Sequence, residues 1–130
     1  MARIEVPVSA GELVDKLTIL EIKSERIGEA AKLVNVRREL AGLTAIVGPL
    51  LAAQTALGPL KSSLRAVNET LWQIEDDIRD CERRKDFGPS FVELARKVYR
   101  TNDRRAALKR EIDTLLGSEL VEEKSYQAYD

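Results

Sequence analysis

The apolar residues of this chain recur at helical spacing over much of its length. Across residues 60–81, apolar side chains alternate at intervals of four and three positions, which is the pattern of a helix that pairs with another helix along a continuous seam. Residues 89–116 carry a second long apolar stripe, and Gly117 is typical of the residue that ends a helix. The segment 86–89 (DFGP) breaks the chain between the two stripes. We therefore predict a long coiled-coil-like hairpin of two helices.

A shorter helix is predicted near the N-terminus. Ser9 and Glu12 have the spacing of a capping box, so the helix should begin near Ala10, and Gly28 should end it. Its apolar residues fall on two nearly opposite faces. A helix with two apolar faces is usually central in a bundle or covered by a partner, and we expect self-association or binding of a protein partner through it.

A further helix is expected from about Glu29 to Val47. Two Gly-Pro pairs, at 48–49 and 58–59, then bracket a segment that reads as a short helix or an apolar loop. The second proline suits the first turn of the helix that contains the seam.

The two ends of the chain have a different character. In residues 1–9, Ile4, Val6 and Val8 alternate with other residues, which predicts a short extended segment. Residues 117–130 form an acidic tail, which we expect to be a short helix or a loosely docked segment without regular structure. Residues 1–130 are thus predicted to fold as one all-α domain, an antiparallel bundle of about four helices or a pair of helical hairpins.

Composition narrows the possible chemistry. The 21 basic and 22 acidic residues leave a net charge of -1, so no overall field recruits nucleic acid, and we expect no nucleic-acid partner. The absence of histidine removes catalysis by histidine and most zinc sites. The single cysteine, Cys81, rules out an internal disulfide and suits a reducing compartment. No cofactor is expected, and any metal would be a hard ion such as Mg²⁺ held by carboxylates.

Neither an export signal nor a membrane-spanning segment is evident. The first twelve residues contain no apolar run of the kind found in signal peptides, and no stretch approaches eighteen uninterrupted apolar residues. The sequence therefore predicts a cytoplasmic protein with no membrane span.

Trp72, the only tryptophan, stands in a polar flank of the predicted third helix and not in its seam. Asn68, Glu75 and Arg79 share this flank, and six acids fall between Glu69 and Glu82. One interpretation is that another helix packs on the flank and covers the tryptophan, because large aromatic residues are usually mostly buried. The alternative is a ligand or partner site.

The predicted fourth helix has polar residues in the middle of its core face, including Asn102 and Arg105. Such residues need partners when they are buried. One account is an ion-pair network that fixes the register of the helices, with Arg105 and Lys109 facing either Glu75 or the Glu21 and Glu25 pair. The other is a cleft that binds an anion, or Mg²⁺ at Glu21 and Glu75. The candidate residues for either account are Glu21, Glu25, Asn68, Glu69, Trp72, Glu75, Asp76, Arg79, Asn102, Arg105 and Lys109.

One enzyme family with a related motif fits poorly. All-α nucleoside triphosphate pyrophosphohydrolases carry a Glu-x-x-Glu helix followed by a Glu-x-x-Asp helix around Mg²⁺. In this chain the Glu-x-x-Asp pair, Glu12 and Asp15, comes first, and the Glu-x-x-Glu pair, Glu119 and Glu122, lies in the C-terminal tail. The chain departs from that pattern in both order and placement.

Four blocks of sequence resemble a family of short bacterial proteins classed as a domain of unknown function. The blocks are "GELVDKLTILEIKSERI", "NETLWQIEDDIRDCE", "FVELARKVYRTNDRRAALKREI" and "GSELVEEKSY". Members of that family are often encoded near glycosyltransferase and surface-polysaccharide genes, so the resemblance implies a link to such systems.

Two functional hypotheses follow. The first is a non-enzymatic interaction or accessory module, linked to cell-surface polysaccharide or glycosyltransferase systems. The second is a small enzyme or binding protein that uses Mg²⁺ or an Arg/Lys clamp on phosphorylated or nucleotide-type ligands.

Overall fold

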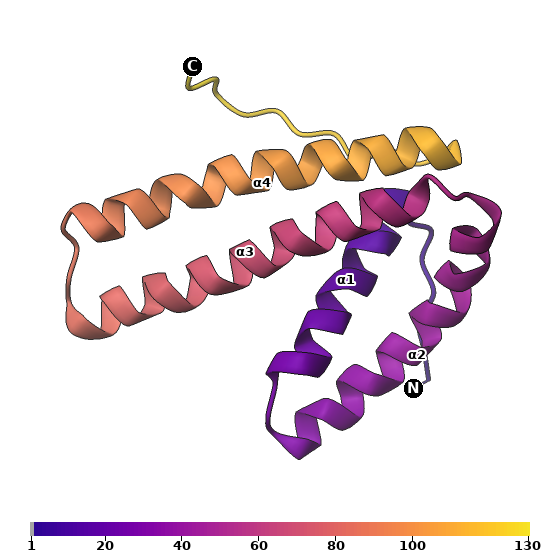
Figure 1. Ribbon diagram of the computed structural model, residues 1–130, viewed down its shortest axis with the longest axis horizontal. Coiled ribbons are helices and arrows are strands. Elements are labelled where there is room, and N and C mark those ends of the chain that lie inside the picture. The colour runs from indigo at the N-terminus through magenta and orange to yellow at the C-terminus, as the bar shows by residue number, and fades with distance from the viewer. Residues whose placement is uncertain (1) are drawn as a thin grey trace.

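Four helices form two hairpins in the computed structural model, which describes residues 2–130. They are α1 (Ala10–Arg26), α2 (Ala30–Ala53), α3 (Leu57–Arg84) and α4 (Pro89–Leu116). The long α3/α4 hairpin and the shorter α1/α2 hairpin cross near one end of the long one (Figure 1). No strand occurs within the described residues. The all-α prediction and the long hairpin are confirmed.

The helix ends follow the predicted signals. The Ser9 hydroxyl accepts a hydrogen bond from the Glu12 N–H at 3.1 Å, so Ser9 caps α1 as expected. Gly117 has φ +60° and ends α4 in the left-handed conformation, which glycine adopts without a Cβ penalty. At the other end of the long hairpin, Lys85 takes the same conformation at the C-terminus of α3.

The predicted break at Gly48 and Pro49 is wrong, because α2 continues through both residues to Ala53. A proline inside a helix removes one hydrogen bond, here the one to the carbonyl of Ala45, and normally kinks or ends the helix. Pro49 and Ala45 both lie on the exposed side of α2, where water can satisfy the freed carbonyl. The chain turns at residues 54–56, and Pro59 falls in the first turn of α3, where its missing N–H has no helical partner.

The seam predicted along α3 packs against α4. Leu64, Val67, Ile74 and Cys81 are buried along it, and the packing between these two helices is the most extensive in the protein. Only the half of the hairpin nearest Leu57 meets the other two helices, and the half with the α3/α4 turn projects beyond them (Figure 1).

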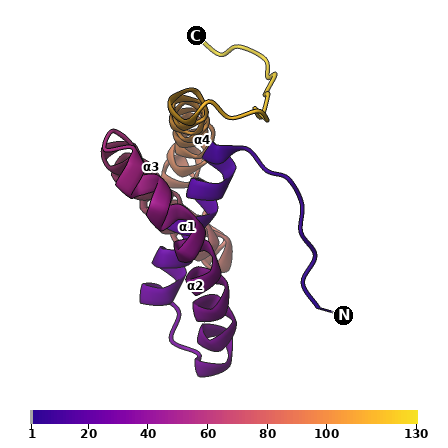
Figure 2. The same cartoon turned by 90° about the vertical axis from the view of Figure 1, so that its right-hand side faces the viewer.

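Helix α1 is central, which explains its two apolar faces. It packs against α2 on one side and against α3 and α4 on the other (Figure 2). Val14, Leu17, Leu20 and Ile22 are at most 2% exposed. Because the other helices cover both faces, α1 offers little apolar surface for self-association or for a partner.

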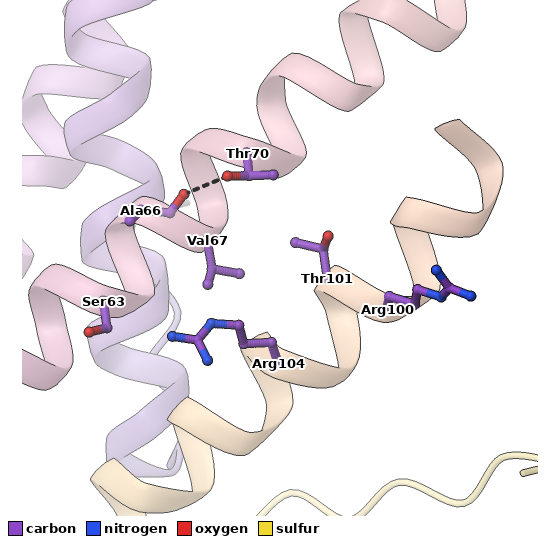
Figure 3. A pocket seen from close by; sticks show the side chains of 7 residues that line it. All are labelled: Ser63, Ala66, Val67, Thr70, Arg100, Thr101 and Arg104. Carbon is purple, nitrogen blue, oxygen red and sulfur yellow. Dashed lines mark hydrogen bonds between the residues drawn. The ribbon is translucent and has the colours of Figure 1, made fainter. Parts of the chain in front are cut away.

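Among residues 2–130, no other helix packs on the face of the α3/α4 hairpin opposite α1. A shallow groove opens there between Ser63, Ala66 and Thr70 of α3 and Thr101 and Arg104 of α4 (Figure 3).

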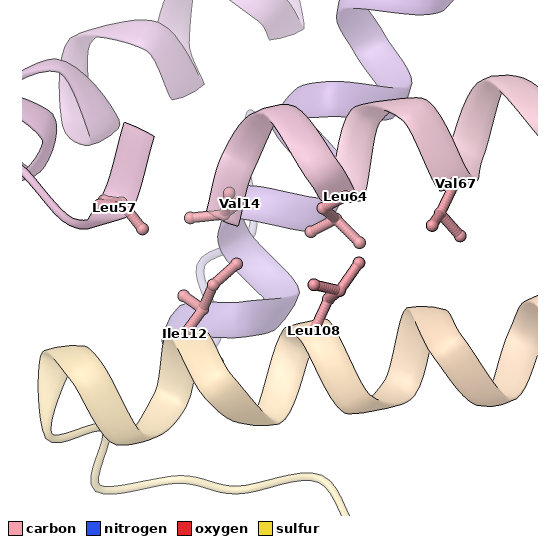
Figure 4. Close-up of a cluster of buried hydrophobic side chains, with 6 residues drawn as sticks. All are labelled: Val14, Leu57, Leu64, Val67, Leu108 and Ile112. Atoms are coloured by element: carbon pink, nitrogen blue, oxygen red, sulfur yellow. The ribbon is translucent and has the colours of Figure 1, made fainter. Parts of the chain in front are cut away.

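The hydrophobic core lies where the two hairpins cross. One side chain of α1 inserts between the apolar residues of α3 and α4, and all of them are nearly inaccessible to solvent (Figure 4). The cluster consists of Val14, Leu57, Leu64, Val67, Leu108 and Ile112.

Within the described residues, the segments before α1 and after α4 form no helix. Residues 2–8 run as an exposed extended segment up to the buried cap residue Ser9, and Figure 2 shows the segment leaving the helices. Residues 118–130 turn back along α4 without forming a helix (Figure 1). Within residues 2–130, no helix combines the length and the apolar character needed to span a membrane.

Candidate functional site

A buried carboxylate, Asp15 of α1, lies where α1 crosses the long hairpin, and its side chain is 1% exposed. Its Oδ1 accepts hydrogen bonds from Arg105 Nε at 3.0 Å and from Asn68 Nδ2 at 2.8 Å, and its Oδ2 accepts one from Arg105 Nη2 at 2.5 Å. A buried carboxylate without partners would be strongly destabilising. Asp15 therefore connects α1 to α3 and α4.

Thr18 and Asn68 complete the polar contact between α1 and α3. The Asn68 amide also donates to Thr18 Oγ1 at 2.9 Å, and the Thr18 hydroxyl donates to the backbone carbonyl of Asp15 at 2.8 Å. Both side chains are buried. Each polar atom in these contacts has a partner, as a polar group inside a protein core requires.

Lys109 of α4 lies beside the same carboxylate. Its Nζ is 2.7 Å from Glu12 Oε2, 3.1 Å from Glu122 Oε2 and 3.8 Å from Asp15 Oδ2. Burial lowers the pKa of Lys109, but the hydrogen bonds to Glu12 and Glu122 outweigh it and leave the pKa above its ordinary value. The hydrogen bond to Asp15 likewise raises the pKa of Arg105. We call Asp15, Thr18, Asn68, Arg105 and Lys109 the Asp15 network.

The N-terminus of α1 is held against the end of α4. The Gly11 N–H donates to Asp113 Oδ1 at 2.6 Å and the Ala10 N–H donates to Ser118 Oγ at 3.1 Å, so α4 and the residue after its cap satisfy backbone donors that a helix start leaves free. The approach is close, because a Cβ added at Gly11 would lie 2.3 Å from the Lys109 carbonyl oxygen. Only glycine permits this contact.

A second group of charges joins α1 to α3. Glu21 Oε2 accepts a hydrogen bond from Lys61 Nζ at 3.1 Å, while Arg65 pairs with both Glu25 and Glu69. The hydrogen bond to Glu25 raises the pKa of Arg65. Glu21 Oε1 is buried without a hydrogen-bond partner among the described residues, and the nearest cation is Arg65 Nη1 at 3.7 Å.

The remaining candidates lie apart from both groups. Glu75 pairs with Arg79 one turn away on the surface of α3, and Asp76 is exposed. Trp72 is half-buried, so it is neither completely covered by a helix nor presented on the surface. The flank predicted around Trp72 therefore divides, with Asn68 in the Asp15 network and Glu75 and Arg79 in solvent.

Asn102 and Arg105 also line an open cavity of about 1020 Å³ between α4 and the C-terminal tail. The tail is held at its far end by the Tyr129 hydroxyl, which donates to Asp103 Oδ2 at 2.6 Å. The rings of Tyr99 and Tyr129 pack at 5.0 Å between centroids.

Of the two accounts of the polar residues, the geometry favours the ion-pair network, although its members differ from those predicted. Arg105 and Lys109 pair with Asp15, Glu12 and Glu122, and not with Glu75, Glu21 or Glu25. The partners differ because α1 crosses α4 near its own N-terminus, which brings the first turns of α1 to Arg105.

The same pairing bears on ligands. Arg105 and Lys109 already face carboxylates, so an anionic ligand would have to displace the side chain of Asp15 or Glu12. Glu21 and Glu75 bind different cations, and within residues 2–130 no three acidic or thiol side chains gather as a metal site requires.

Sequence reasoning missed Asp15 and Thr18, the centre of the network. A usable signal was present, because Asp15 and Thr18 lie three residues apart among the buried residues Val14 and Leu17. Two polar residues inside an apolar helix face indicate polar partners on the neighbouring helices.

Comparison with known proteins gives a family without an assigned role. Residues 4–129 match the model of a family described as a family of unknown function, DUF6165. No curated protein and no solved structure shows a significant match to the chain. The family match covers nearly the whole sequence, as the resemblance of the four blocks led us to expect. The chain belongs to the DUF6165 family.

Proposed function

We propose that this protein is a non-enzymatic interaction module that binds a helix of another protein through the outer face of α2. In this proposal the partner belongs to a system that makes or modifies cell-surface polysaccharide. The exposed apolar side of α2 supports the binding surface. The link to polysaccharide rests on the resemblance of the four sequence blocks to proteins encoded beside such genes.

The observation that carries the proposal is how little of α2 is buried. Of its 24 residues, only Val36 and Val47 are buried. Val34 and Ile46 are each 56% exposed. No charged residue occurs from Leu40 to Leu60. Small apolar residues extend the exposed surface along the side of α2 away from α1, namely Ala31, Ala41, Ala45, Pro49 and Ala52.

A surface of this kind is typical of a protein interface. Contiguous exposed apolar surface marks interaction sites more often than scattered single residues do. Alanine side chains let a second helix approach closely, and an amphipathic helix is a common ligand for an apolar helix face. α2 packs mainly on α1 and scarcely on α3, so its outer side is free to receive one.

Charge indicates what the partner carries. Arg37 and Arg38, at the N-terminal end of this surface, form no ion pair within residues 2–130, whereas the adjacent Glu39 pairs with Lys16. A second copy of α2 packed on this face would bring no free carboxylate to the two arginines. The surface therefore fits an amphipathic helix of a different protein, with acidic residues beside its apolar stripe.

A photo-crosslinking amino acid at Ala45 tests the surface in cells of the native host. The control places the same amino acid at Ala95, which is exposed on α4 far from α2. We expect one discrete protein adduct at Ala45 only, joined through an amphipathic acidic helix. Identical adducts at both positions, or an adduct with a second copy of this chain, would contradict the proposal.

A further inference from the structure

We propose that the groove between α3 and α4 binds the phosphate group of a small phosphorylated ligand, with Arg100 and Arg104 as its cationic donors. The groove lies on the face of the long hairpin that α1 leaves uncovered. It is separate from the outer face of α2, so this proposal does not depend on the proposed interaction with a partner helix.

The groove exists because the α3 side chains along it are small. Ser63, Ala66 and Thr70 form one wall, and the nearly buried Val67 lies at the floor. The cavity is about 410 Å³. That volume lies within the range of small-molecule sites, roughly 300–1,000 Å³.

The cations of the groove differ from the other cations of α4. Four of the seven basic residues of α4 have carboxylate partners, namely Arg96, Arg105, Lys109 and Arg110. Lys97, Arg100 and Arg104 form no ion pair within residues 2–130 and lie three and four residues apart, which places them on one side of the helix. Like charges at this spacing repel each other, and a bound anion would relieve that repulsion.

The donors suit phosphate in kind and in position. Figure 3 shows Arg104 extended across the groove toward α3, below Val67 and near Ser63. Thr101, nearly one turn before Arg104, also lines the groove, while the Thr70 hydroxyl on the other wall donates to the Ala66 carbonyl at 3.1 Å. A guanidinium fork can bind two phosphate oxygens at once, and hydroxyl groups donate to a third.

Arg100 lies one turn before Arg104. Its side chain points out of the groove in Figure 3 and is exposed, so it is free to turn toward a bound phosphate. The pair can then contact the anion from two sides.

The surroundings favour a small ligand over a nucleic acid. The acidic run of α3 that begins at Glu69 continues along the same hairpin, with Glu75, Asp76 and Asp77 all exposed. A long polyanion would be repelled there, whereas one phosphate or diphosphate group fits between Ser63 and Thr70.

The test is an NMR titration of the full chain with inorganic pyrophosphate. The variants are Arg100→Gln and Arg104→Gln. Arg110→Gln is the control, because it removes the same charge from α4 outside the groove, at a position where Arg110 pairs with Glu123. We expect saturable shifts of the amides of residues 63–70 and 100–104. Affinity should fall about tenfold in Arg104→Gln, about 1.4 kcal/mol, and should be unchanged in Arg110→Gln.

Three results would overturn the proposal. The first is no saturable shift up to about 10 mM pyrophosphate, a concentration that reveals even millimolar binding. The second is equal weakening in Arg104→Gln and Arg110→Gln, which would reduce the effect to overall charge, and the third is tighter binding of a single-stranded oligonucleotide than of pyrophosphate. Because Arg104 is exposed, unchanged thermal unfolding should accompany its substitution, which separates loss of binding from loss of fold. Saturable pyrophosphate binding together with no protein adduct at Ala45 would support the phosphate site and contradict only the interaction proposal.

Discussion

Arg105 donates two hydrogen bonds to the carboxylate of Asp15, which lies 90 positions earlier in the chain. This contact and the bond from Asn68 join α1 to both helices of the long hairpin at one buried point. Polar groups at such a point contribute little net stability compared with apolar packing, but they penalise any other register of the helices. We interpret the Asp15 network as the device that sets how the two hairpins cross.

Replacing Asp15 with alanine should destabilise the fold strongly. The substitution leaves Arg105 and Asn68 without their buried partner, and breaking a buried ion pair costs about 3 kcal/mol or more. Chemical denaturation measures the change. Asp76→Ala is the control, because Asp76 is exposed, and it should change the free energy of unfolding by less than about 0.5 kcal/mol. Equal effects of the two substitutions would show that the network does not hold the hairpins together.

Replacing Gly11 with alanine should also destabilise, although alanine favours helices. The new Cβ would lie 2.3 Å from the Lys109 carbonyl oxygen, so α1 would have to move away from α4 and weaken the Gly11–Asp113 hydrogen bond. We expect a loss of about 2 kcal/mol, typical of overpacking in a tight contact. Gly42→Ala on exposed α2 meets no atom within 4 Å and should instead stabilise by up to about 1 kcal/mol. Thermal unfolding of both variants distinguishes steric contact from helix propensity.

The docking of the C-terminal tail should resist mild acid. The hydrogen bond from Lys109, aided by Lys124, lowers the pKa of Glu122 from 4.5 to about 2. A carboxylate with a lowered pKa in the folded state contributes stability above its unfolded pKa, and that contribution is lost as the pH falls through the folded pKa. The contact should therefore persist at pH 4 and be lost as the pH falls through about 2.

An NMR titration of the Glu122 carboxyl carbon checks this window. Lys109→Met, which keeps the length of the side chain without its charge, should return the pKa of Glu122 toward 4.5. An ordinary pKa for Glu122 in the unmodified protein would show that the tail is not held at Lys109.

Much of the fold could be predicted because its signals are local. The heptad spacing of α3, the Ser9 cap and the Gly117 end each depend on residues within one helix, and each is confirmed. Pro49 misled the prediction because its effect depends on context. A proline breaks a helix less severely where the freed carbonyl faces water. The apolar stripe from Leu33 to Val47 places Pro49 on the opposite, exposed side, but the Gly-Pro pair considered alone predicts a break.

The candidate site could be predicted only in part, for a related reason. Asn68, Arg105 and Lys109 were among the predicted candidates, Asn68 from the flank of Trp72 and Arg105 from the core face of α4, and the structure brings all three into one network. Their partner Asp15 was not recognised, because pairing depends on where α1 crosses the long hairpin. Spacing along single helices carries no information about that crossing point.

The most direct test of the account is the affinity of the partner identified by crosslinking at Ala45. The measurement compares the unmodified chain with Ala45→Arg and with Ala95→Arg, which adds the same charge at an exposed position on α4. An arginine within an apolar interface is buried without a partner, so Ala45→Arg should weaken binding at least tenfold, about 1.4 kcal/mol. Ala95→Arg should leave the affinity unchanged, and all three chains should unfold at the same temperature. Equal affinity of Ala45→Arg and the unmodified chain would contradict the assignment of α2 as the binding surface.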